Sequence, residues 1–214
     1  MFLHVTTQIP GVPHDGLLSE KGGRGFPFLC VLDAKGDVVV EHDGPRTVQG
    51  FRETGGLAKR YVELKPKADG GDRSARIDFA LLRARMGKLP LEECRKEISG
   101  LGDLTPEQRK TLDGLEADAR VDEILKTSHA KAFLELRAEG KIPVSFQRRS
   151  SFWATLLGYA EYAKDAGLYG EALEELRALH GDDPGAARFL AQAEEKLTAM
   201  EREAERGASE EEER

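Results

Sequence analysis

The two cysteines have the most distinctive chemistry in this chain, and their spacing limits what they can do. Cys30 and Cys94 lie far apart in the sequence and form neither a CxxC pair nor a disulfide framework. Thiol–disulfide exchange needs a low-pKa attacking thiolate and a second, resolving thiol. Cys30 stands within an apolar run, which predicts a buried, inert thiol, and Cys94 follows two glutamates whose charges raise its pKa. Nothing requires a disulfide between the two, and that pairing stays an open alternative.

Neither the histidines nor the glycine-rich stretch shows a ligand-binding pattern. The five histidines lack a metal-binding spacing such as HExxH; they are His4, His14, His42, His129 and His180. The run Gly22-Gly23-Arg24-Gly25 precedes an apolar strand, whereas a phosphate-binding loop follows a strand and opens a helix. We therefore expect no metal site and no cofactor.

Two serines follow a short basic stretch in the second half of the chain. Ser150 and Ser151 come directly after Arg148 and Arg149. A nucleophilic serine needs an adjacent base, and no histidine or aspartate stands where it would activate either hydroxyl. We therefore expect no catalytic residue here and interpret the serines as a helix N-cap. We expect the two arginines to be solvated, with an acidic partner as the alternative.

Composition and charge narrow the class of protein. The chain has 214 residues, 39% of them hydrophobic, and a formal net charge of -7, which allows one or two domains. The acidic balance argues against a nucleic-acid partner, because phosphate binding needs clustered Lys and Arg. We find no run of about 18 apolar residues to span a membrane and no signal peptide. Two lone cysteines predict a cytoplasmic protein, with the periplasm as the alternative if an N-terminal signal is missing.

The chain divides into two parts at a polar seam. Residues 1–66 are neutral by count of charged side chains, whereas residues 67–214 carry the whole net negative charge. The stretch 65–72 contains a proline, paired glycines and several charges, which indicates a linker. We predict a first domain over 1–66, a helical domain over 67–206 and a disordered acidic tail over 207–214.

The first part is predicted to contain strands and one helix. Strands are expected over 2–7, 27–32 and 38–42, with a turn over 33–37 in which Gly36 supplies positive φ. Residues 27–32 are almost continuously apolar, which predicts a central strand buried on both faces. A helix follows over 48–64, with an interruption at Gly55-Gly56.

The segment from Gly25 to Val39 resembles the second half of a thioredoxin-fold domain. An aromatic residue and a proline lead into a strand, a turn rich in Asp, Lys and Gly follows, and a partner strand and a helix extend the likeness over residues 2–65. The resemblance implies that Pro27 is a cis-proline and that the backbone of Phe26 docks an extended peptide. It thus makes Gly25, Phe26 and Pro27 the substrate-binding residues. The alternative is that Pro27 only begins a strand.

The W-C-x-x-C segment of the thioredoxin family has no counterpart in this sequence. Without the strand and helix that carry it, the sheet would have an exposed edge and an uncovered face. The helical part, a second copy in a homodimer, or a missing N-terminal portion of a longer protein would each solve this problem. We favour the last, in which truncation removed the catalytic part.

The second part is predicted to be helical. Apolar periodicity and Gly or Pro punctuation place helices at 76–86, 90–99, 106–127, 129–139, 150–166, 169–180 and 184–206. Thr105 and Gln108 have the spacing of a capping box at the start of the third helix.

The helices over 150–166 and 169–180 resemble one tetratricopeptide hairpin. Small residues, Ala160 and Ala172, occupy the positions at which the two helices of such a hairpin touch. Pro184 lies at the position where the repeat pattern has a proline. Leu156 replaces the Trp of that pattern, and Ala163 replaces its Tyr. A single unit cannot bury its own face, so we expect the earlier helices to stack on it.

The sequence therefore predicts the α+β class, with a partial thioredoxin-like α/β unit followed by an all-α, tetratricopeptide-like domain. The predicted function is a thioredoxin-like protein without its own CxxC. It would be a noncatalytic protein- or peptide-binding module or the C-terminal part of a thiol-disulfide oxidoreductase. The alternative is a helical-repeat interaction scaffold with a vestigial thioredoxin-like half. In each case the expected partner is a protein or peptide.

Overall fold

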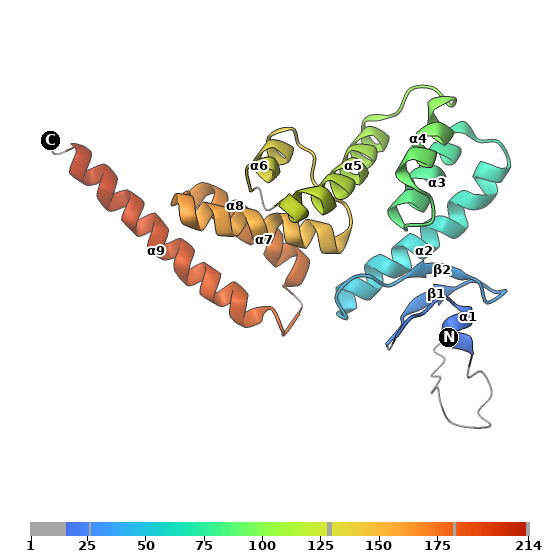
Figure 1. Cartoon of the computed structure of the whole chain (residues 1–214), viewed down its shortest axis with the longest axis horizontal. Coiled ribbons are helices and arrows are strands. Elements are labelled where there is room, and N and C mark those ends of the chain that lie inside the picture. The colour runs from blue at the N-terminus through green and yellow to red at the C-terminus, as the bar shows by residue number, and fades with distance from the viewer. Residues whose placement is uncertain (1–15, 26, 128–129, 182, 213–214) are drawn as a thin grey trace.

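The computed structural model describes residues 16–25, 27–127, 130–181 and 183–212. The strand expected over 2–7, as well as Phe26, lies outside these residues. The described chain is mostly helical with one small antiparallel sheet, in agreement with the α+β class (Figure 1). Its elements are α1 Leu17–Glu20, β1 Cys30–Leu32, β2 Val38–Glu41, α2 Val48–Asp69, α3 Arg73–Arg85, α4 Leu91–Ser99, α5 Pro106–Thr127, α6 Ala130–Ala138, α7 Phe146–Ala163, α8 Ala166–His180 and α9 Ala187–Glu212.

The β1–β2 hairpin forms as expected, but its first strand is not central. β1 pairs with β2 alone among the described residues, with Val31 opposite Val40. The turn closes through the Asp33 carboxylate, which accepts bonds from the backbone N–H of Lys35 and Asp37, and Gly36 has φ +84°. The expectation of burial on both faces is wrong, because Leu32 is 40% exposed. Apolar side chains on successive residues do not make a strand central when only one neighbour pairs with it.

Helix α2 is continuous through Gly55-Gly56, where an interruption was expected. Thr47 caps its start by accepting a bond from the Gly50 N–H, and Ala58 packs on the hairpin. That packing offsets the two glycines, each of which costs a helix interior about 1 kcal/mol. His42 at the end of β2 adds a bond of 2.7 Å between its Nδ1 and the Thr54 hydroxyl.

The expected linker is shorter than its composition indicated. α2 runs past Pro66 to Asp69, so residues 65–69 are helical rather than linker. The connection to α3 is a tight turn over 70–72, in which Gly71 has φ +89°. Asp72 ends the turn by accepting a bond of 2.8 Å from the Ala75 N–H, which caps α3.

The helices pack largely in chain order. α2 lies on α3, α3 on α4 and α5, α5 on α6 and α7, α7 on α8, and α8 on α9. In Figure 1 the hairpin lies at one end of an elongated molecule, and α9 leads away to the C-terminus at the other. One apolar cluster lies among α3, α4 and the first half of α5, with Leu112 and Leu115 from α5. A second extends from the other half of α5, with Val121 and Ile124, to α9.

Two local sequence predictions in the helical part are confirmed. Gln108 and Thr105 form the capping box, since each backbone N–H bonds the other's side chain, at 3.2 and 3.0 Å. Ala160 and Ala172 are both fully buried where α7 meets α8. α7 nevertheless begins at Phe146, four residues before the expected start. α9 continues to Glu212, past the expected end at 206.

Candidate functional site

Charged and polar side chains gather where α7 begins, between α5 and α8. We call this cluster the α7 junction. It comprises Ser145, Arg148, Arg149 and Ser150 from α7 and its cap, Asp118 and Asp122 from α5, and Glu175 and His180 from α8.

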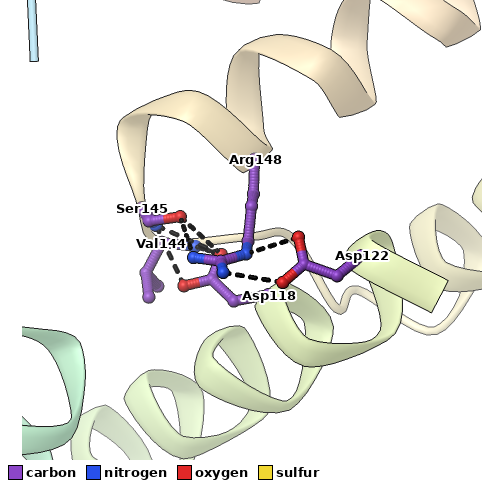
Figure 2. A network of polar contacts seen from close by, with 5 residues as sticks. All are labelled: Asp118, Asp122, Val144, Ser145 and Arg148. Atoms are coloured by element: carbon purple, nitrogen blue, oxygen red, sulfur yellow. Dashed lines mark hydrogen bonds and ion pairs between the residues drawn. The ribbon is translucent and has the colours of Figure 1, made fainter. Parts of the chain in front are cut away.

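The α5 side of the junction is built around a buried carboxylate. Asp118 is 7% exposed and accepts bonds from the backbone N–H of Val144 at 3.0 Å and of Ser145 at 3.1 Å. The Ser145 hydroxyl donates a further bond to it, at 3.2 Å. Figure 2 shows this carboxylate against the first turn of α7. Asp118 thus supplies from α5 the acceptor that a helix start needs, because Ser145 makes no side-chain cap bond of its own.

The two aspartates of α5 have carboxyl pKa values shifted in opposite directions, that of Asp118 by burial and that of Asp122 by a neighbouring positive charge. Burial is the largest influence on Asp118 and raises the pKa of its carboxyl, against the effect of the bonds from Ser145 and the charge of Arg148. Asp122 lies nearer the surface and meets the Arg148 guanidinium at 2.9 and 2.7 Å (Figure 2). Those bonds hold the pKa of Asp122 below its usual value.

The α8 side of the junction brings a serine and a histidine together. The Ser150 Oγ lies 2.7 Å from the Nε2 of His180, the last residue of α8. The Phe146 ring packs edge-on against the imidazole, with centroids 4.9 Å apart. Burial lowers the pKa of His180, and the charge of Asp183 opposes that shift. The imidazole is therefore a neutral hydrogen-bond partner for Ser150 near neutral pH.

Two buried nitrogen donors on the same stretch of α7 have no acceptor among the described residues. They are the Arg149 Nε and the Trp153 Nε1. Another nitrogen of Arg149 pairs with the Glu175 carboxylate. Buried donors without acceptors are uncommon in folded proteins.

Two interpretations of the basic stretch are wrong. Ser150 and Ser151 do not cap α7, because the helix begins earlier and both serines lie inside it. Arg148 and Arg149 are not simply solvated, since each forms an ion pair within the chain. No histidine was expected beside Ser150, whereas the fold brings the His180 Nε2 to 2.7 Å from its Oγ. The predicted helical hairpin could have indicated this contact, because such a hairpin brings the start of one helix close to the end of the next.

The substrate-binding residues implied by the thioredoxin resemblance lie elsewhere. Gly25 and Pro27 are exposed in the segment before β1, and Phe26 lies outside the described residues. Within the described chain, no hydrogen bond or ion pair connects Gly25 or Pro27 to the α7 junction.

The two cysteines are free, and both thiols have raised pKa values, which lowers their reactivity. Cys94 is fully buried, and burial together with the charge of Glu97 raises the pKa of its thiol to about 11. Cys30 is half-buried, rather than fully buried as expected, and burial raises the pKa of its thiol too. The alternative of a Cys30–Cys94 disulfide is not realised.

Other site types have little support in the described part of the chain. Its His, Cys, Asp and Glu side chains include no group of three or more placed to hold a metal ion. None of its helices combines the length and apolar character needed to cross a membrane. An open pocket of about 250 Å³ lies at the end of α2, lined by Ala68, Asp69, Arg76, Phe79, Arg83, Glu97 and Leu101.

Comparison with protein families, with curated proteins and with solved structures finds no match for this chain.

Proposed function

We propose that this chain is a protein- or peptide-binding scaffold of stacked helices that performs no thiol chemistry of its own. The observation that carries the proposal is the order of packing, in which most helices contact chiefly their neighbours in the sequence. Helices stacked in this manner form an extended surface rather than a closed globule, and such surfaces serve widely to bind other proteins.

Exposed apolar side chains on several of the helices support the proposal. Several helices present a large apolar residue to solvent, at Val62 of α2, Leu125 of α5, Tyr162 of α7 and Phe189 of α9. Tyr162 is 89% exposed. Tyrosine and phenylalanine are enriched among the residues that contribute most to protein–protein binding.

The state of the cysteines supports a noncatalytic role. A thiol must ionise to attack a disulfide, and both thiols have raised pKa values. They are also unpaired, so neither has a resolving partner.

A second candidate is the C-terminal part of a thiol-disulfide oxidoreductase. The observation that favours it is the hairpin with α2 packed on it, which is the arrangement that the thioredoxin resemblance implies. An in-frame W-C-x-x-C segment in the DNA upstream of Met1 would support this candidate. A stop codon close upstream would contradict it.

Selection from a displayed peptide library, with counter-selection against an unrelated helical protein, tests the scaffold proposal. We expect saturable binding that Phe189→Ser weakens at least about tenfold, while Gln192→Ala, at an exposed polar position of the same helix, leaves it unchanged. Binding lost on Pro27→Ala but not on Phe189→Ser would place the surface in the thioredoxin-like part. Failure to select any saturable peptide would contradict both versions.

A further inference from the structure

Ser150 has two features that a reactive serine requires, and the proposed scaffold function uses neither of them. Its hydroxyl contacts an imidazole nitrogen, and it is half-buried rather than sealed in the core. We propose that Ser150 is an activated nucleophile, with His180 as its general base, that accepts acyl or phosphonyl groups from small activated esters.

The geometry of the pair fits this chemistry. A serine hydroxyl attacks poorly unless a base within about 2.6–3.2 Å removes its proton, and Nε2 of His180 is 2.7 Å from Oγ of Ser150. The base must be neutral to accept that proton, and burial of His180 favours the neutral ring. The edge-on contact with Phe146 restricts the orientation of the imidazole.

Two buried donors that lack an acceptor among the described residues lie on the same stretch of α7 as Ser150. Residues 149, 150 and 153 lie within an arc of about 100° on α7, because successive helical residues are about 100° apart. Arg149 and Trp153 therefore both lie to one side of Ser150 around the helix, at about 100° and about 60° from it. Attack on an ester turns its carbonyl oxygen into an oxyanion, which N–H donors stabilise. Both nitrogens are sealed from solvent in the folded chain, so they would reach such an oxygen only after the side chains over them move.

The proposed reaction proceeds in two steps. The Ser150 Oγ forms a bond to the carbonyl carbon while its proton passes to the His180 Nε2. The ester C–O bond then breaks, and the departing alkoxide takes that proton, which leaves an acyl-serine. In the second step water forms a bond to the acyl carbon while His180 takes one of its protons. The bond between that carbon and Oγ then breaks, Oγ receives the proton from His180, and the carboxylic acid leaves. With a fluorophosphonate the first step forms the Oγ–P bond, expels fluoride and stops there.

Labelling of the full chain with an alkyl fluorophosphonate tests the proposal directly. Intact mass should show one adduct per chain, and peptide mapping should place it on Ser150. Mapping on the unmodified protein decides the matter even if a variant folds poorly. Labelling of another residue, scattered labelling or no labelling would overturn the proposal.

Three variants show whether the serine acts through the histidine. Ser150→Ala should abolish the adduct, and His180→Gln should slow labelling by about 10²-fold or more. Ser151→Ala is the matched control, because it removes the neighbouring hydroxyl and leaves the pair intact. Equal rates for His180→Gln and the unmodified protein would refute the role of His180. These results do not depend on peptide binding, so this proposal and the scaffold proposal can fail separately.

Discussion

Removal of the Asp118 carboxylate should destabilise the connection between α5 and α7. Asp118→Ala deprives two backbone N–H groups and one hydroxyl of their acceptor at the start of α7. A hydrogen bond to a charged group contributes about 1.5–3 kcal/mol. The Val144 and Ser145 donors are only half-buried, so water replaces part of that loss. We expect the free energy of unfolding to fall by about 3 kcal/mol.

Urea denaturation followed by far-UV circular dichroism and by tryptophan fluorescence measures this loss. Trp153 is the single tryptophan of the chain and lies on α7, so its emission reports the affected region. The matched control is Asp122→Ala, which removes a carboxylate one helical turn away. The side chain of Asp122 is 48% exposed in its ion pair, so that change should cost less than about 1 kcal/mol. Equal losses for the two variants would refute the reasoning.

The stability that Asp118 provides should also depend on pH in a defined direction. Its raised pKa means that the folded state holds this proton more tightly than the unfolded state, whose reference pKa is 3.8. Stability from this residue is therefore greatest below the reference value and falls as pH rises through the raised native value. The difference in unfolding free energy between the unmodified protein and Asp118→Asn should shrink as pH rises from about 3 to about 7. A difference that grows with pH would contradict the assignment.

Three further predictions concern helix starts, glycines and thiols. Gln108→Ala removes both the capping-box acceptor and a bond of 3.0 Å to Asp78, so thermal unfolding should show a loss of about 1–2 kcal/mol. Gly50→Ala should destabilise the fold, because the new Cβ would lie 2.0 Å from a backbone oxygen. Gly55→Ala places its Cβ in open space and should stabilise the fold by about 0.5–1 kcal/mol. Equal shifts in the melting temperature of the two variants would be evidence against this reasoning. Titration with an aromatic disulfide reagent should modify Cys30 in the native protein and Cys94 only on unfolding; rapid native modification of both thiols would contradict the burial of Cys94.

Local signals in the sequence predicted the structure well. The capping box of Thr105 and Gln108 depends on residues three positions apart, and the turn around Gly36 depends on a positive φ that glycine tolerates. Such features require no knowledge of the rest of the chain, and the bounds of α5, which follows the capping box, agree with the expected 106–127.

Features that depend on distant packing were not predictable in the same manner. The Ser150–His180 contact requires the register of α7 against α8, and Asp118 caps a helix that begins 28 residues later. The interruption predicted at Gly55-Gly56 was wrong because packing of neighbouring residues on the hairpin outweighs the intrinsic cost of glycine. The apolar run over residues 27–32 predicted a central strand, but such a run does not determine how many other strands pair with it, and β1 pairs with β2 alone among the described residues.

The place of α5 in both apolar clusters has a consequence for the order in which the chain opens. Its first half packs with α3 and α4, and its second half packs toward α7. Partial opening of either cluster frees one end of α5 and leaves the other held. Backbone amides near the middle of this helix should therefore exchange with solvent only when both clusters open, and those near its ends should exchange through smaller openings. Helix α5 thus couples two cooperative units of the helical part.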